Sequence, residues 1–233
     1  EVIDSINYFK KKRNKKSIGR SNNSERLWSY LISSKKLQKY VNHWLQDSSK
    51  LKSTYELKTK EIIETNWLRK IFHLKSKKFM KLQFIDERTG TPVTPRDMGL
   101  GISQFLPILI SSLVLERSKI YIEQPELHLH PALQCEVADE FIRSKNIQNN
   151  KFIIESHSEH LLLRVMKRLR HSAEGKFKKG DELYLTPEDI CLLYVDNNGD
   201  FTYLNELELD EDGTLLDPWP NGFFEEGQNE RFD

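Results

Sequence analysis

A short apolar segment, residues 120–122, ends in the acid Glu123. A carboxylate at the C-terminal end of a buried strand lies where an open α/β sheet holds its ligand, and in nucleotide hydrolases it holds Mg²⁺ beside the phosphates. The next residue is the amide Gln124, where such hydrolases usually carry a second acid. An amide can orient water but cannot take its proton, so Gln124 predicts weak general-base chemistry. A buried acid that only stabilises the fold is the alternative interpretation of Glu123.

Two further segments could act on the same ligand. Residues 99–104 (Gly-Leu-Gly-Ile-Ser-Gln) stand at the predicted start of a helix, where glycines let the backbone approach a ligand and unpaired N–H groups favour an anion such as phosphate. His157 follows a predicted strand, residues 152–155, and a histidine there can donate a hydrogen bond to a γ-phosphate. Taken singly, the first segment is also typical of an ordinary glycine-rich helix start, and a lone histidine is more often structural.

An alternation of strands and helices is needed to position these segments. The apolar strands 120–122 and 152–155 are each followed by a helical pattern, at 131–144 and at 159–170. This strand–helix–strand–helix order is the signature of an α/β fold. Further predicted elements are a hairpin over 79–94, an apolar helix over 105–117 and a hairpin over 191–204.

Three regions are predicted along the chain. Apolar residues recur at helical spacing in 27–32 and 37–45, so residues 1–77 are expected to form a Lys-rich helical insertion or arm. Residues 78–195 hold the α/β pattern and its candidate site. Residues 196–233 are acidic and form a small C-terminal appendage of β-structure and loops.

Charge is distributed unevenly along the sequence. Residues 1–81 hold 21 Lys and Arg against 7 Asp and Glu, a net of +14, whereas residues 82–233 hold 15 against 28, a net of −13. The densest basic cluster runs from Lys10 to Lys16 and could contact nucleic-acid phosphates. No base-reading motif accompanies it, so docking on the acidic half or a solvated surface are the alternatives.

Composition indicates a soluble protein of the cytoplasm. The 233 residues are 37% hydrophobic, no apolar run approaches a membrane span, and no signal-peptide pattern opens the chain. Cys135 and Cys191 are too few and too far apart for a disulfide framework or a zinc site. Because the first residue is Glu1 rather than Met, we expect the chain to be a piece of a longer protein.

The order and spacing of the three segments resemble the C-terminal half of an ABC-type ATPase head of the SMC-like kind, a P-loop NTPase fold. The closest likeness is to the prokaryotic branch that contains the overcoming-lysogenization-defect and Septu-type phage-defence ATPases. It is carried by Glu-Gln-Pro-Glu-Leu-His-Leu-His-Pro at 123–131 and by Ser-His-Ser at 156–158, within residues 78–195. Residues 219–224 (Trp-Pro-Asn-Gly-Phe-Phe) also resemble a C-terminal domain of unknown function found on many such ATPases.

The resemblance implies a role for each matching residue around ATP and Mg²⁺. Glu123 matches the Walker B acid, which reaches Mg²⁺ through water, and Gln124 occupies the position of the catalytic glutamate. His157 matches the switch histidine. Glu126 offers an alternative catalytic carboxylate two residues after Gln124.

The resemblance also assigns residues to the seam between two heads. Gly99, Gly101, Ser103 and the adjoining Gln104 match the signature motif, which contacts the γ-phosphate of ATP bound to the opposite subunit. Residues 128–131 fall where the D-loop lies, at the same seam. A metal-binding pair of His128 and His130 is the alternative interpretation, although no third ligand stands nearby in the sequence.

Two departures from the pattern limit the predicted activity. No Gly-x-x-x-x-Gly-Lys-Ser/Thr loop occurs in the sequence, so the phosphate-binding half is expected upstream or on another polypeptide. Loss of a general base typically costs about 10²–10⁴-fold in rate, although a glutamine can orient the attacking water in phosphoryl transfer. Gln124 therefore predicts slow hydrolysis and long-lived ATP-bound dimers.

The expected function is a nucleotide-dependent switch. Two heads would sandwich two MgATP molecules in a homodimer or higher homo-oligomer, and closure would control an effector such as a nuclease or toxin in anti-phage defence. A nucleic-acid-binding repair clamp is the alternative of a different class. A degenerate scaffold that binds nucleotide without turnover is the third.

Overall fold

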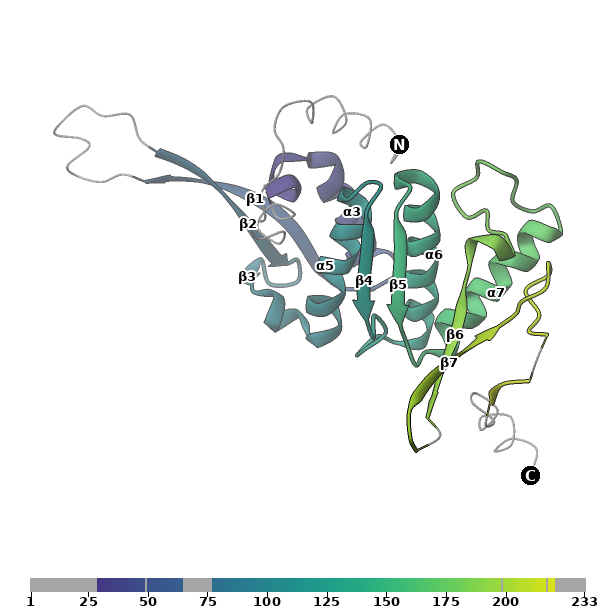
Figure 1. Cartoon of the computed structure of the whole chain (residues 1–233). Helices are drawn as coiled ribbons and strands as arrows, with labels where there is room; N and C mark the ends of the chain where they lie inside the picture. Colours follow the sequence, from purple (N-terminus) through teal and green to yellow (C-terminus); the bar gives the residue numbers. More distant parts are fainter. Residues whose placement is uncertain (1–28, 49, 65–76, 198, 217, 221–233) are drawn as a thin grey trace.

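The computed structural model describes residues 29–48, 50–64, 77–197, 199–216 and 218–220 (Figure 1). The chain forms three small sheets, and its helices lie between strands in the sequence. The β1–β2 hairpin extends away from the rest of the molecule (Figure 1). The helices are α3 (Lys35–Gln46), α5 (Leu100–Val114), α6 (Pro131–Gln148) and α7 (Glu159–Ala173). The strands are β1 (Tyr55–Glu64), β2 (Lys77–Asp86), β3 (Thr91–Val93), β4 (Lys119–Glu123), β5 (Lys151–Glu155), β6 (Leu192–Asn197) and β7 (Thr202–Leu207).

The first sheet is antiparallel, in the order β1-β2-β3. Leu57 of β1 pairs with Phe84 of β2, which in turn pairs with Val93 of β3. Leu57 and Phe84 are buried against the main core. The turn between β2 and β3 is closed by Asp86, whose carboxylate accepts hydrogen bonds from the Arg88 backbone and guanidinium. The hairpin predicted over 79–94 is therefore confirmed.

The expected helical insertion over residues 1–77 is wrong at residues 55–64. Residues 55–64 form strand β1, which pairs along its whole length with β2. Charged side chains such as Lys58 and Lys60 are depleted in strands on average. The segment nevertheless alternates like a strand, with Leu57 buried and both lysines exposed. The predicted boundary at residue 77 also falls inside this sheet. The basic cluster from Lys10 to Lys16 lies outside the described residues.

The second sheet holds the two parallel strands β4 and β5. Helix α6 makes the crossover between them, as parallel strands require. The register pairs Ile122 with Ile154 and Glu123 with Glu155, so both strands end at the same edge of the sheet. Both predicted strands and both following helices are confirmed, although α6 continues to Gln148 and α7 to Ala173.

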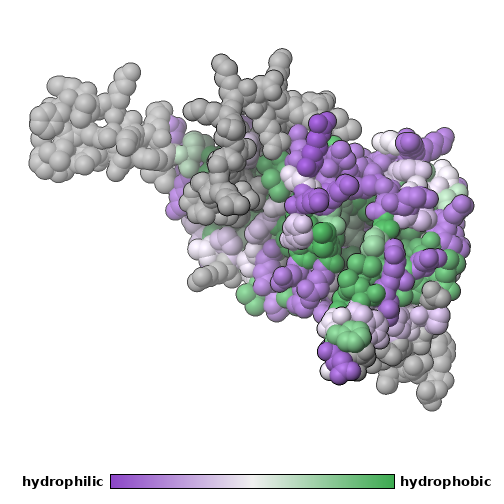
Figure 2. Space-filling model, in the orientation of Figure 1, coloured by the Kyte–Doolittle hydropathy of each residue, from purple (hydrophilic) through white to green (hydrophobic). Residues whose placement is uncertain are grey.

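Among the described residues, one face of this parallel sheet is covered and the other is open. Ile120 and Ile122 are buried in the core with residues of α3, α5 and α6. Trp44 of α3 is fully buried, with its ring centroid 4.9 Å from that of Phe105 of α5. On the opposite face, Tyr121 and Ile153 are 69% and 57% exposed. Figure 2 shows apolar side chains gathered among polar ones on this side of the molecule.

Helix α5 begins earlier than the predicted helix over 105–117. It starts at Leu100, after Gly99 with φ of 96°, and ends at Val114. Residues 99–104 thus form the start of this helix, as their glycines predicted. Pro107 lies within the second turn.

Buried ion pairs join α6 to its neighbours. The carboxylate of Asp139 accepts from Arg164 and, through both oxygens, from Arg168 of α7, each at 2.6 Å. Glu140 accepts from Tyr40 of α3 at 2.9 Å and from Arg143 at 2.8 Å. Burial raises the pKa of the Glu140 carboxyl, and the positive charge of Arg143 acts against that shift. These pairs fix the helices that cover the parallel sheet.

The C-terminal region is a β6–β7 hairpin followed by a loop. Strand β6 spans residues 192–197, so the predicted domain boundary at 195 falls inside the hairpin rather than before it. Gly213 of the loop has φ of 77° and lies against the Met166 carbonyl and Leu169 of α7, where a side chain would collide. The appendage therefore packs on the last helix of the α/β half. In the described part of the chain, no helix is both long and apolar enough to cross a membrane.

Candidate functional site

The candidate site lies at the edge where β4 and β5 end. Glu123 and Glu155 occupy paired positions on the two strands, and the Gln124 N–H donates to the Glu155 carbonyl at 2.8 Å. His157 follows two residues after Glu155. The side chains of Glu123, Glu155 and His157 are exposed, and that of Gln124 is half-buried. The strand ends thus place these four side chains at one solvent-facing edge.

Gln124 has a left-handed backbone, with φ of 47°. Only glycine, and occasionally Asn or Asp, adopts this conformation routinely, so a glutamine there carries local strain that its surroundings must hold. The chain turns sharply after it, because the Leu127 N–H donates to the Gln124 carbonyl at 3.2 Å. Pro125 is buried inside the turn. Gln124 is therefore fixed at the point where the strand leaves the sheet.

Glu126 ties the loop after β4 to the loop after β5. Its side chain is buried, and its two carboxylate oxygens accept from the Ser156 hydroxyl at 2.9 Å and the His157 N–H at 2.7 Å. Ser158 then begins α7, since its hydroxyl accepts from the Leu161 N–H at 3.0 Å. The backbone of His157 is thus held by a residue 31 positions earlier in the chain.

The segment at 99–104 also reaches the loop after β4. A Cβ added to Gly101 would lie 2.5 Å from the backbone carbonyl oxygen of His128, so only glycine fits this contact. Ser103 donates its hydroxyl to the Leu100 carbonyl at 2.9 Å, and Gln104 is exposed. The start of α5 and the loop carrying Glu126 are therefore in direct contact.

All three predicted segments converge, but they do so through different contacts. The start of α5 meets the loop after β4 at Gly101, and that loop meets the loop after β5 through Glu126. His130 caps α6, accepting from the Ala132 N–H at 3.3 Å. The described residues contain no group of three or more His, Cys, Asp or Glu that could hold a metal ion. The alternative of a metal site at His128 and His130 gains no third ligand from the fold.

Two residues of this site were missed by the sequence reasoning. Glu155 stands beside Glu123, and like charges on directly paired strand residues repel each other. A divalent cation near Glu123 would offset that repulsion. Ser156 is the second residue, because its hydroxyl holds Glu126. The matching acids at the ends of two apolar strands were a signal for Glu155. Ser156 belongs to the Ser-His-Ser motif at 156–158, but no role was assigned to it.

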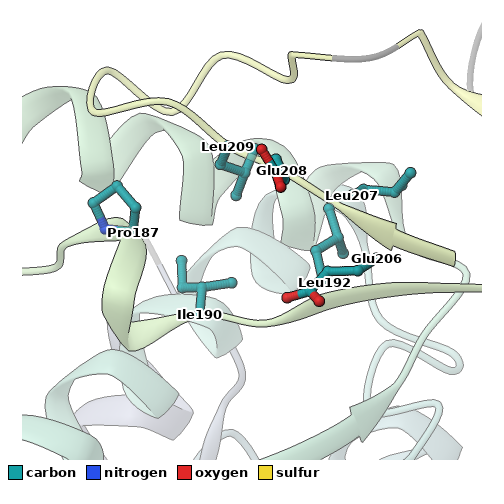
Figure 3. A pocket seen from close by; sticks show the side chains of 7 residues that line it. All are labelled: Pro187, Ile190, Leu192, Glu206, Leu207, Glu208 and Leu209. Carbon is teal, nitrogen blue, oxygen red and sulfur yellow. The ribbon is translucent and has the colours of Figure 1, made fainter.

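A separate pocket lies in the C-terminal region (Figure 3). Its wall combines apolar side chains with two acids from β7 and the segment that follows. None of its lining residues belongs to the candidate site at the ends of β4 and β5. The lining residues are Pro187, Ile190, Leu192, Glu206, Leu207, Glu208 and Leu209.

Comparison with protein families gives two matches. A family model described as an AAA ATPase domain matches residues 1–162, a range that contains every residue of the candidate site. A second model, described as a protein of unknown function (DUF3696), matches residues 185–232. A search of curated proteins found no match. The first match covers more than half of the chain, and its family has the α/β fold of P-loop NTPases.

Proposed function

Since this chain belongs to the AAA ATPase domain family, we propose that it forms the C-terminal half of an ABC-like ATP-hydrolysing head. Glu123 would reach Mg²⁺ through water, Gln124 would orient the attacking water, and His157 would donate to the γ-phosphate. Bound Mg²⁺ would neutralise charge that develops on the phosphate oxygens. The observation that carries the proposal is that the backbone brings these three residues to one edge of the parallel sheet.

The seam between two heads would involve the start of α5. Gly99, Gly101 and Ser103 would contact the γ-phosphate of ATP held by a second copy, with Gln104 beside them. Helix N-termini favour anions because their N–H groups are unpaired. The contact between Gly101 and the His128 carbonyl supports a joint movement of this helix and the loop after β4 when two heads close.

The open face of the parallel sheet supports a further segment that completes the head. Parallel sheets are almost always covered on both faces, yet Tyr121 and Ile153 are exposed and, among the described residues, β4 and β5 pair only with each other. The sequence also contains no phosphate-binding loop of the Walker A type. A segment that carries this loop, on the same polypeptide or another, would cover this face.

The complete head would act as a slow switch rather than a fast motor. Gln124 has no carboxylate to take a proton, so ATP-bound dimers would live long enough to hold a partner in one state. By the family resemblance, that partner is a nuclease or toxin used against phage. Association of heads would therefore depend on ATP, and release of the effector would follow hydrolysis.

Single-turnover hydrolysis tests this function. In the complete protein, Gln124→Glu should accelerate ATP hydrolysis by about 10²-fold or more, because it restores a general base. Gln46→Glu, an exposed change at the end of α3, is the matched control and should leave the rate unchanged. Measurable ATP binding with no hydrolysis in either the wild type or Gln124→Glu would instead support the scaffold without turnover.

A further inference from the structure

The carboxylate of Glu126 is fully engaged within the protein. One oxygen accepts from the Ser156 hydroxyl at 2.9 Å and the other from the His157 backbone N–H at 2.7 Å, and the side chain is only 9% exposed. A general base needs an oxygen directed at the attacking water, within hydrogen-bond reach of it. Both oxygens of Glu126 are instead directed at the neighbouring loop.

The bonds of Glu126 form part of a closed ring. The Ser156 hydroxyl accepts from the Ser158 N–H at 3.0 Å, and the Ser158 hydroxyl donates to the Gln134 side-chain oxygen at 2.6 Å. The Gln134 amide donates to the Leu129 carbonyl at 3.0 Å, and the Leu129 N–H donates to the Glu126 carbonyl at 3.0 Å. The ring joins both strand-end loops to the first turn of α6 and the start of α7.

From this ring we infer that Glu126 is a positioning residue, which holds the backbone of His157 so that its side chain stays at the site edge. The inference rests on the proposed ATPase function. Hydrogen bonds to an ionised acceptor are about twice as strong as neutral ones, so a buried carboxylate is suited to hold two donors at once. His157 itself is exposed, and without this bond its loop would lose the contact that ties it to β4.

Two substitutions separate positioning from general-base catalysis. Glu126→Gln keeps the shape of the side chain: its oxygen can accept from the His157 N–H, and its amide can donate to the Ser156 hydroxyl, but it cannot act as a base. Positioning predicts that Glu126→Gln stays within about tenfold of the wild-type single-turnover rate. Glu126→Ala removes both bonds, and displacement of a catalytic group by about 1 Å can cost about 10²-fold.

A double-mutant cycle with His157→Ala distinguishes a role of Glu126 that acts through His157 from a general loss of stability. If Glu126 acts through His157, Glu126→Ala should reduce the rate about 10²-fold in the wild type and hardly at all when His157 is already Ala. A milder variant, Ser156→Ala, keeps the bond to the His157 N–H and should cost less than Glu126→Ala. Glu174→Gln, at an exposed ion pair, is the matched charge control.

Hydrogen exchange at the His157 amide tests the inference independently of turnover. This amide should be protected in the wild type and in Glu126→Gln, and exposed to exchange in Glu126→Ala. A rate for Glu126→Gln as low as that of Glu126→Ala, with the amide still protected, would make Glu126 the base and overturn the inference. Unchanged exchange in Glu126→Ala would overturn it as well. Absent hydrolysis in every variant, with the expected exchange pattern, would instead count against the ATPase function alone.

Discussion

The antiparallel sheet β1-β2-β3 and the parallel pair β4–β5 differ in how their strands are connected and covered. In the first, each strand pairs with its neighbour in the sequence, and the turn at Asp86 is closed by bonds within three residues. In the second, an 18-residue helix separates the strands, and only one face is covered. The antiparallel sheet thus joins strands that follow one another directly in the chain, whereas the parallel pair needs a crossover helix to bring its second strand back.

This difference indicates where a further segment is expected to contact the molecule. An antiparallel sheet can face water on one side, but parallel sheets occur almost only with both faces covered. Tyr121 and Ile153 on the open face are therefore the side chains expected to meet another segment. The candidate site lies at the end of this same sheet, so a segment that covered the open face would lie next to it.

The largest expected effect concerns the helices that cover the parallel pair. Asp139 is 3% exposed and accepts from both Arg164 and Arg168. Asp139→Ala would leave the partly buried guanidinium of Arg168 without its carboxylate partner and Arg164 with Glu136 alone, at 3.4 Å. Breaking such a buried pair typically costs about 3–5 kcal/mol. Urea unfolding of the purified chain, followed by circular dichroism, measures this loss.

An exposed ion pair provides the control for that variant. Glu174 and Lys176 are 46% and 58% exposed, and exposed pairs contribute about 0–1 kcal/mol. Glu174→Ala should therefore leave the unfolding midpoint almost unchanged. Equal losses for Asp139→Ala and Glu174→Ala would show that the helix layer does not depend on its buried charges.

The next largest effect compares the two faces of the parallel pair directly. Ile122 is 9% exposed and Ile153 is 57% exposed. Ile122→Ala should cost about 2–4 kcal/mol through lost burial and a cavity, whereas Ile153→Ala should stay within about 0.5 kcal/mol in the isolated chain. Denaturant unfolding of both variants, measured under the same conditions, would give these two losses in stability.

The complete protein sharpens that comparison. Once a further segment covers the open face, Ile153→Ala should cost clearly more than it does in the isolated chain. An unchanged small cost there would mean that Ile153 stays in water, and that the open face is not where the head is completed.

The sequence predicted the parallel pair well and the first sheet only in part. Apolar runs at β4 and β5, each followed by a helical pattern, carry a strong signal because both strands have a buried side. Strand β1 was missed because its exposed face carries Lys58 and Lys60, and long charged side chains resemble a solvated helix in a basic region. Its buried position at Leu57 depends on pairing with Phe84 of β2, which lies 27 residues further along the chain.

Within the site, residue types and spacing identified the strand-end residues but not the bonds between loops. Glu123 and His157 were predicted from their positions after apolar strands, which a sequence pattern can reveal. The bond from Glu126 to the His157 backbone joins residues 31 positions apart. Its existence depends on how two loops fold back at one sheet edge, and no periodicity encodes that proximity.

A smaller effect is expected where α5 meets the loop after β4. Replacing a helical glycine with alanine usually stabilises a helix by about 1 kcal/mol. At Gly101 the new Cβ would lie 2.5 Å from the His128 carbonyl oxygen, so we expect a net loss of about 1–3 kcal/mol. Ser103→Ala on the same turn is the control and should have little effect. A stabilised Gly101→Ala variant would show that the contact is loose.

The smallest effect lies in the turn of the antiparallel sheet and depends on pH. Hydrogen bonds from Arg88 lower the pKa of Asp86 from 3.8 to about 2. Because the folded state favours the ionised carboxylate, the stabilisation is fully present above about pH 4 and is lost as the pH falls from there to about 2. The free energy of unfolding of the wild type should therefore exceed that of Asp86→Asn at pH 6, and the difference should shrink between pH 4 and pH 2.

Glu87→Gln removes an exposed acid from the same turn and should show no such convergence, since no bond from Arg88 holds it. A difference between wild type and Asp86→Asn that stays constant down to pH 2 would mean that the contribution of Asp86 does not depend on its ionisation.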